Sequence, residues 1–171
     1  MAGRGSFTES FPLFGYDLHD YDELFTEHLE LLLKLRDSDR ITWKGKHRPS
    51  IDSRGVYPRP VQTPLPVWIA VGGTPESVVR AATLGLPLTL AIIGGEPARF
   101  KPFTDLYKKV WVETGHDPAT MQLAIGSHGF IADSNDEAAE LVYPAYVETM
   151  GRIGRERGWG PVGRAQFDFE R

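Results

Sequence analysis

PVWIAVGGTPESVVRAATLGLPLTLAIIGGEP, residues 66–97, decides the fold, because it reads as a strand, a helix and a second strand in succession. The two apolar runs, 67–71 and 88–93, are nearly continuous rather than alternating, and this pattern is typical of a parallel sheet covered on both faces. Between them, Thr74 and Pro75 favour the first turn of a helix. The stretch therefore predicts a complete β-α-β unit.

The turn after the first predicted strand contains Gly72 and Gly73. Glycine lets a backbone approach a bound group closely, and the helix that follows begins with N–H groups that have no partner within the helix. Together these features predict an anion site, and phosphate is the anion that fits it best. A tight turn before a well-capped helix, without any ligand, explains the same residues and stays open at this point.

Helix and strand signals continue on both sides of this unit. Residues 1–6 read as the end of a strand, and apolar residues recur at helical spacing over 20–36. Beyond the unit, the pattern predicts a further helix, a strand over about 121–132, and a last helix opened by a capping box of Ser134 and Glu137. The chain thus contains about four β-α units.

Four such units amount to half of a closed TIM (β/α)8 barrel, which typically needs about 250 residues. A small open doubly wound sheet is the other arrangement, but the turns lack the Gly-x-Gly-x-x-Gly dinucleotide fingerprint. We therefore predict the α/β class and a partial TIM barrel, with residues 1–171 as one truncated domain. Half a barrel leaves sheet edges and an apolar inner face uncovered, so we expect a homodimer or a complementary chain.

Residues 37–66 interrupt the β-α pattern with an irregular segment that contains five prolines. ITW at 41–43 and GVY at 55–57 are candidates for two short strands of a hairpin. Long irregular connections are uncommon in compact domains unless they cover a site or an interface. The segment is therefore predicted to be an insertion or a lid.

Composition excludes several classes of partner. The formal charge of −4, without a concentrated basic segment, argues against nucleic acid and anionic membranes, and the longest apolar run is too short to span a bilayer. The absence of cysteine excludes disulfides and cysteine-based zinc sites, and the five histidines show no metal-ligand spacing. We expect a cytoplasmic protein that holds no metal and acts on a small molecule.

Three segments resemble the bacterial-luciferase-like family of flavin-dependent monooxygenases. They are GRGSFTESFPLFG at 3–15, the glycine-containing unit at 66–95, and LYKKVWVETGHDP at 106–118, in the order and at about the spacing of that family. The resemblance implies a TIM-type barrel of which this chain supplies the fourth to seventh strand-helix units. It thereby supports the fold predicted from the strand and helix pattern.

The resemblance also implies a cofactor site. Arg4 is similar to an arginine that holds the flavin phosphate, and Gly72, Gly73, Thr74 and Ser77 resemble the loop and first helical turn that contact the same phosphate. Some relatives place a second arginine where this chain has Tyr21 and Asp22. Polar groups that act near the reactive edge of the flavin lie largely on early strands that this chain lacks. The catalytic residues are therefore unknown.

By resemblance, the function is that of an oxidoreductase that uses reduced FMN and O2 to oxygenate a small organic substrate, with a separate flavin reductase. The deazaflavin F420 is the alternative cofactor. A second hypothesis is a non-catalytic barrel remnant that binds flavin or phosphate weakly, or only associates with other chains. A third is an unrelated barrel enzyme whose residues 72–77 grip a phosphorylated substrate.

Overall fold

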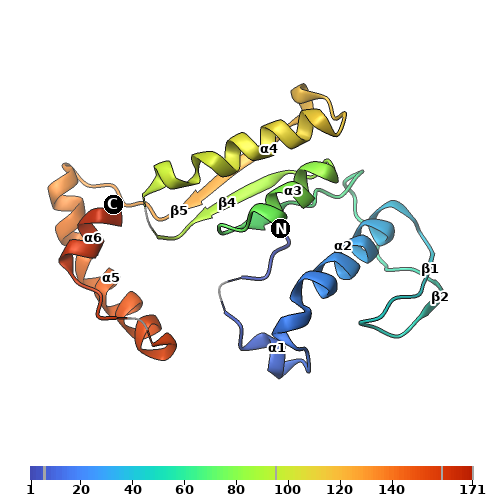
Figure 1. Ribbon diagram of the computed structural model, residues 1–171, viewed down its shortest axis with the longest axis horizontal. Coiled ribbons are helices and arrows are strands. Elements are labelled where there is room, and N and C mark those ends of the chain that lie inside the picture. Colours follow the sequence, from blue (N-terminus) through green and yellow to red (C-terminus); the bar gives the residue numbers. More distant parts are fainter. Residues whose placement is uncertain (6, 95, 159, 171) are drawn as a thin grey trace. The chain divides into compact units, whose positions relative to one another are not determined.

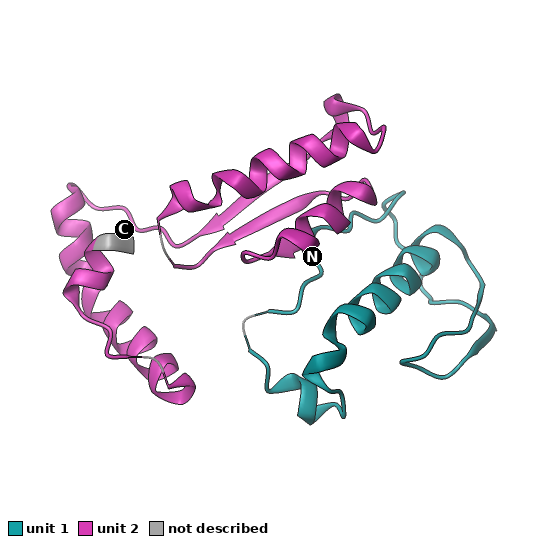
Figure 2. Ribbon diagram, in the orientation of Figure 1, with its two compact units in different colours: residues 1–69 teal, residues 70–171 magenta. Residues whose placement is uncertain are grey.

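The structure is a computed structural model that describes residues 1–5, 7–94, 96–158 and 160–170. Gly95, near the end of the stretch 66–97 that predicts the β-α-β unit, lies outside the described residues. The chain divides into two compact units, Met1–Ile69 and Ala70–Arg171 (Figure 2). Each unit is described separately below.

The second unit is built on a three-stranded sheet of order β3-β4-β5 (Figure 1). Its strands are β3 (Ile69–Val71), whose first residue is the last residue of the first unit, β4 (Leu88–Ile92) and β5 (Leu123–Ser127). β4 and β5 run parallel, with Leu88 opposite Leu123 and Ile92 opposite Ser127. The predicted parallel sheet is confirmed, although β5 is shorter than expected because only five residues of β4 are available to pair with it.

Helices follow the strands as predicted. α3 (Pro75–Thr83) connects β3 to β4, and α4 (Lys101–Glu113), preceded by the short helix η2 (Pro97–Phe100), connects β4 to β5. The turn η3 (Pro118–Thr120) precedes β5. Because β3, α3 and β4 follow one another, the predicted β-α-β unit is confirmed. α3 and α4 pack against each other.

The core of the second unit lies between this helix pair and β4. Val78, Ala81, Leu88, Leu90 and Tyr107 all have exposed fractions of 0%. The hydroxyl of Tyr107 donates to the carbonyl oxygens of Leu86, at 2.9 Å, and Gln122, at 3.3 Å. Burial raises the pKa of Tyr107 to about 12. Because Leu86 lies two residues before β4 and Gln122 immediately precedes β5, Tyr107 ties together the two strands at their amino-terminal ends.

The last part of the second unit is helical. α5 (Asn135–Arg157) begins with the predicted Ser134 cap, since Glu137 N donates to Ser134 Oγ at 3.1 Å, while Glu137 Oε2 accepts from the N–H of Asp133, one residue before the N-cap, at 3.2 Å. α6 (Arg164–Glu170) follows and contacts α5, which the sequence pattern had not indicated. Among the described residues, no helix has both the length and the apolar character needed to cross a membrane.

The first unit begins with an isolated parallel bridge. Ala2 pairs with Ile69, and Ala2 N donates to Trp68 O at 2.7 Å. This pairing agrees with the prediction that residues 1–6 contain the end of a strand. The helices α1 (Ser10–Leu13), η1 (Leu18–Asp20) and α2 (Tyr21–Asp37) follow.

A hairpin of β1 (Ile41–Trp43) and β2 (Ile51–Arg54) completes the first unit. The predicted strand ITW is confirmed, but the second strand precedes GVY instead of coinciding with it. The physical reason is packing. Ile51 lies against a cluster of Leu31, Ile41 and Trp43, whereas Val56 and Tyr57 have exposed fractions of 57% and 63%.

Candidate functional site

The turn between β3 and α3 is open and shaped by glycine. Gly73 has φ +139°, and a Cβ atom built at Gly72 or Gly73 meets no other atom within 4 Å. A side chain is strained in that half of φ space, so Gly73 permits a conformation that other residues rarely adopt. The backbone here is therefore accessible to a ligand.

The first turn of α3 lacks a side-chain cap. Thr74 occupies the predicted N-cap position, but its side chain makes no cap hydrogen bond, and Pro75 has no N–H to donate. Ser77 N donates to Thr74 O at 3.1 Å, and the Ser77 side chain has an exposed fraction of 6%. Gly72, Gly73 and Thr74 are exposed, so they present the turn to solvent while Ser77 lies beneath it.

Arg4, the fifth predicted site residue, belongs to the first unit. It is exposed, and its guanidinium carbon lies 5.3 Å from the centroid of the Tyr21 ring. Such a cation–π contact orients a guanidinium without neutralising its charge. Tyr21, one of the two residues at which the resemblance predicts a second arginine in some relatives, supports Arg4 in this chain. The structure thus brings together residues 72–77 at one turn and places Arg4 on a different element.

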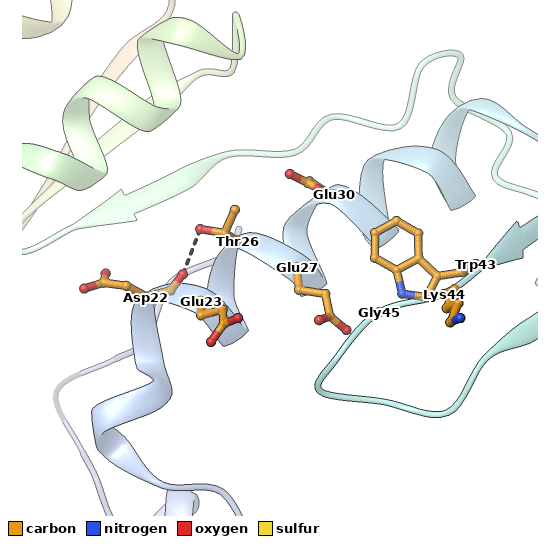
Figure 3. A pocket seen from close by; sticks show the side chains of 8 residues that line it. All are labelled: Asp22, Glu23, Thr26, Glu27, Glu30, Trp43, Lys44 and Gly45. Atoms are coloured by element: carbon orange, nitrogen blue, oxygen red, sulfur yellow. Dashed lines mark hydrogen bonds between the residues drawn. The ribbon is translucent and has the colours of Figure 1, made fainter.

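The first unit also contains an acidic pocket of about 520 Å³ between α2 and the segment after β1. Figure 3 shows Asp22, Glu23, Glu27 and Glu30 of α2 on one side and Trp43 on the other. Four carboxylates in one depression repel a phosphate. No group of three or more His, Cys, Asp or Glu side chains within the described residues is arranged to hold a metal ion. A phosphate is therefore not expected in this pocket.

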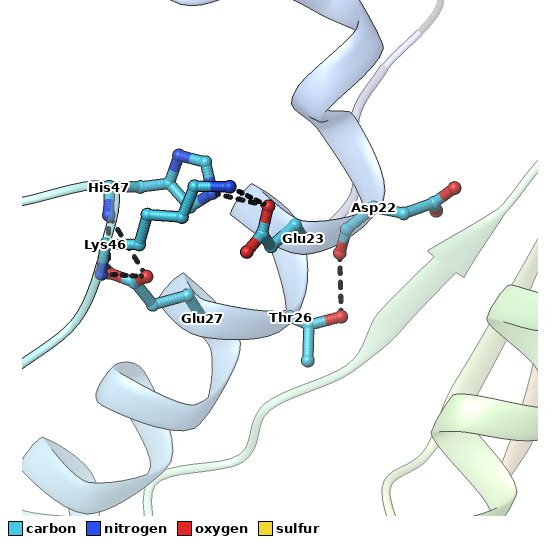
Figure 4. A network of polar contacts seen from close by, with 6 residues as sticks. All are labelled: Asp22, Glu23, Thr26, Glu27, Lys46 and His47. Atoms are coloured by element: carbon cyan, nitrogen blue, oxygen red, sulfur yellow. Dashed lines mark hydrogen bonds and ion pairs between the residues drawn. The ribbon is translucent and has the colours of Figure 1, made fainter.

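A polar network at the same place attaches the hairpin to α2 (Figure 4). Glu27 accepts from the backbone N–H groups of Lys46, at 2.7 Å, and His47, while Glu23 accepts from Lys46 Nζ at 2.6 Å. Desolvation acts to raise the pKa of Glu27, but the two backbone hydrogen bonds outweigh it and lower this pKa. The hydrogen bond from Lys46 lowers the pKa of Glu23. The carboxylates remain ionised and serve to hold the hairpin.

The model of the luciferase-like monooxygenase family matches residues 1–170. The chain belongs to the luciferase-like monooxygenase family. Members of this family are oxidoreductases or monooxygenases, so the predicted resemblance is confirmed and the hypothesis of an unrelated barrel enzyme is dropped. No curated protein is similar enough to count as a match.

Two solved structures are similar to this luciferase-like chain. The monooxygenase RslO1 from Streptomyces bottropensis shares 21% identity at a TM-score of 0.69, over 90% of this chain and 49% of that one. An F420-dependent secondary alcohol dehydrogenase, solved with an F420-acetone adduct, shares 21% identity at a TM-score of 0.61, over 77% and 39%. The chain therefore spans about half or less of the length of these structures, and the predicted partial TIM barrel is confirmed.

Sequence reasoning missed Thr89 in this luciferase-like chain. Alternation along β4 places Thr89 on the face opposite Leu88 and Leu90, and Thr89 lies beside Ala124 of β5. Its hydroxyl is buried and has no hydrogen-bond partner among the described residues. A single polar residue in the apolar run LPLTLAII was the available signal. Buried polar groups are normally paired, so Thr89 marks a face where a further group is expected.

We predict that Thr89→Val raises the free energy of unfolding by about 1 kcal/mol, because valine has the same shape and removes an unpaired buried hydroxyl. Urea denaturation measures the change. Thr26→Val is the matched control, since the Thr26 hydroxyl is exposed and donates to Asp22 O at 2.7 Å. Thr26→Val should not raise the free energy of unfolding. A Thr89→Val chain less stable than the wild type would contradict the assignment of an unpaired hydroxyl.

His116 has a structural role in the second unit. His116 contacts Thr83 O through Nε2 at 3.1 Å and lies 5.0 Å from the Trp111 ring, so it fastens the turn after α4 to the end of α3. His128 follows β5 and is exposed. Because active sites of TIM barrels lie at the carboxyl ends of the strands, the position of His128 is compatible with a site, but no contact singles it out.

Proposed function

We propose that this chain is the cofactor-binding part of a flavin-dependent monooxygenase, which uses reduced FMN and O2 to oxygenate a small organic substrate. Family membership supports the reaction class. The observation that carries the cofactor proposal is the open turn of Gly72 and Gly73 before the uncapped start of α3. A flavin reductase would supply the reduced cofactor.

The residues of the turn fit a phosphate. An exposed helix N-terminus contributes only about 0.3–1 kcal/mol toward an anion, so a guanidinium is needed to hold it firmly. Arg4 is the proposed guanidinium. The resemblance, which assigns Arg4 and residues 72–77 to the same phosphate, supports a shared site.

Each residue then has a distinct task. The amides of Gly72 and Gly73 would donate to phosphate oxygens, Thr74 would add its uncommitted hydroxyl, and Arg4 would balance the phosphate charge. Reduced flavin, when bound, supplies the electrons that O2 chemistry requires. The deazaflavin F420 is the alternative cofactor, because one structural neighbour is F420-dependent.

A non-catalytic remnant is the second candidate function. It is favoured by the coverage of 49% and 39% of the neighbouring structures and by exposed apolar residues at β4 and β5, including Ile93 at 49% and Ile125 at 60%. Either function needs a second surface against these residues. We propose a homodimer or a complementary chain as that surface. We also propose that residues 1–171 form one domain, in which 37–66 covers a site or an interface.

Titration with FMN, followed by flavin fluorescence, tests the proposed function. Micromolar or tighter binding, together with O2 consumption when chemically reduced FMN is added with substrate candidates, supports a monooxygenase. Binding without O2 consumption above that of free reduced FMN supports the remnant. Absence of FMN and F420 binding at millimolar concentration would contradict the proposed cofactor site.

We predict that Gly73→Ala weakens FMN binding about tenfold or more. Alanine at φ +139° costs about 1–3 kcal/mol, and the turn can relieve that strain only by moving the amides that face the phosphate. Gly129→Ala is the control, because a Cβ there also meets no atom within 4 Å but no positive φ requires glycine. Equal FMN affinity in Gly73→Ala and wild type would show that the turn geometry is not needed.

A further inference from the structure

β5 (Leu123–Ser127) forms one edge of the three-stranded sheet (Figure 1). It pairs with β4 on one side, and within the described residues no strand pairs with it on the other. The opposite edge strand, β3, is bridged by Ala2, which pairs in parallel with Ile69. Of the two edges, β5 is therefore the one that the described part of the chain leaves open.

One hydrogen bond shows which backbone groups face this open edge. Leu88 N donates to Gln122 O at 3.1 Å, so the backbone of Gln122 faces β4. In a parallel ladder the N–H and C=O of one residue point to the same side, and the side alternates from residue to residue. Leu123, Ile125 and Ser127 therefore direct donors and acceptors away from β4. A row of such groups is a template for pairing with another strand.

The open edge lacks the features that normally prevent such pairing. Residues 123–132, LAIGSHGFIA, contain no Asp, Glu, Lys, Arg or Pro, and β5 follows β4 in a regular register without a bulge. Charged residues, prolines and bulges are the usual protection of an edge strand. The hairpin of the first unit has such protection, because β2 contains Asp52 and Arg54 and its register with β1 shifts.

Apolar side chains are exposed at the same edge. Ile125, at the centre of β5, has an exposed fraction of 60%, although Leu90 beside it on β4 has one of 0%. Phe130 and Ile131, which follow the strand, are 54% and 95% exposed. This face of the sheet is therefore covered at β4 but not at β5, and an exposed apolar patch of this kind indicates an interaction surface.

The lack of charge makes a second copy of this chain the occupant that fits best. Two identical strands related by a two-fold axis pair antiparallel, so each side chain of β5 meets a β5 side chain of the copy. Like charges directly opposite each other destabilise such a ladder, and the sequence LAIGS contains none. The edge is thus complementary to itself.

The outward-facing residues also fix the register. With the axis at Ile125, Leu123 lies opposite Ser127 of the copy, and Ile125 lies opposite its own counterpart. This register uses all three outward-facing residues of β5. Each hydrogen-bonded pair of an antiparallel ladder exchanges two bonds, so about six bonds would form. The two isoleucines would lie side by side on one face of the joined sheet.

We propose that β5 pairs antiparallel with β5 of a second copy, with the two-fold axis at Ile125, so that the two three-stranded sheets become continuous. The proposal rests on the homodimer proposed above and names its interface. It is independent of the cofactor site.

Cysteine cross-linking of the full chain tests the register, because the chain has no cysteine of its own. In a hydrogen-bonded antiparallel pair, opposite Cα atoms lie about 5.5 Å apart, within the range of about 4.4–6.8 Å for disulfides. Under mild oxidation, Ile125→Cys should form a covalent dimer at least about tenfold faster than Val79→Cys, whose position on α3 is 38% exposed. Equal rates in the two variants would overturn the proposal.

Sedimentation of the wild type and of two lysine variants tests the interface without cross-linking. The wild type should be a dimer at micromolar concentration. Ile125→Lys should weaken the dimer about tenfold or more, because it places two like charges opposite each other at the axis. Val112→Lys, at a position on α4 that is 55% exposed, is the control and should leave the dimer intact. Circular dichroism shows that both variants are folded.

Two results would overturn the proposal. One is a monomeric wild type, which would leave a complementary chain as the cover of this edge. The other is a dimer that Ile125→Lys and Val112→Lys affect equally.

FMN titration of the same samples separates this interface from the proposed cofactor site. Dimers that form through β5 but do not bind FMN would sink the cofactor site and support the interface. A monomer that binds FMN would sink the interface alone.

Discussion

Tyr107→Ala is expected to lower the free energy of unfolding by about 3–5 kcal/mol, the range for truncation of a buried aromatic side chain. The Tyr107 side chain has an exposed fraction of 0%, its ring lies 5.5 Å from that of Trp111, and its hydroxyl joins the segments that lead into β4 and β5. Alanine removes the packing and both hydrogen bonds. Urea denaturation, followed by circular dichroism, measures the change.

Two further variants separate packing from hydrogen bonding. Tyr107→Phe keeps the ring and should cost about 1–3 kcal/mol, because the carbonyl of Leu86 is left without this donor. Phe130→Ala removes an aromatic side chain that is 54% exposed and should stay within about 0.5 kcal/mol of wild type. If Tyr107→Ala were as mild as Phe130→Ala, α4 would not pack on the sheet as described.

Arg4→Ala is expected to weaken FMN binding about 10- to 100-fold. Hydrogen bonds to a charged group contribute about 1.5–3 kcal/mol, and a guanidinium can offer two to one phosphate. Stability should change little, since Arg4 is exposed. Fluorescence titration with FMN gives the ratio of dissociation constants, and denaturation shows that the variant is folded.

Two control variants distinguish a specific contact between Arg4 and the phosphate from a general effect of positive charge on FMN binding. Arg40→Ala removes an arginine that donates to Ser53 O at 2.7 Å in the hairpin, and it should leave FMN affinity unchanged. Arg4→Lys should give an intermediate affinity, because lysine keeps the charge but not the paired donors. Equal losses in Arg4→Ala and Arg40→Ala would contradict a specific role for Arg4.

Local signals explain why much of the fold was predictable. The β-α-β unit combines continuous apolar strands, a proline at the first helical position and glycine at both turns, and every signal agrees. The Ser134 cap at Glu137 was readable for the same reason, because its partners lie three residues apart. These elements need few distant contacts to be specified.

The sequence pattern did not predict the features that depend on contacts between distant residues. The second hairpin strand lies at 51–54, since Ile51 packs against the cluster that α2 and β1 form, and no local pattern distinguishes Ile51 from Val56. Arg59 donates to the carbonyls of Leu35 and Arg36 at 2.8 Å and so caps the end of α2 from more than twenty residues away. Such partners become visible only when the chain is folded.

Some features of the candidate site were likewise predictable from local sequence, and others depend on contacts between distant residues. Glycine residues and the helix start at 72–77 follow from sequence, because both are consequences of local backbone chemistry. The support of Arg4 by Tyr21 and the unpaired hydroxyl of Thr89 depend on how side chains are placed in the folded chain. The family resemblance predicted Arg4 as a site residue, but it did not predict the contact with Tyr21 that orients the guanidinium.

Amide chemical shifts of the β3–α3 turn, compared between FMN and riboflavin, give the most direct test of the phosphate site. The two ligands differ only in the phosphate, so the comparison isolates the contact assigned to this turn. FMN should shift the amide resonances of Gly72, Gly73 and Ser77, and riboflavin at the same concentration should leave them in place. Unmoved resonances in saturating FMN, or equal shifts with both ligands, would contradict a phosphate site at this turn.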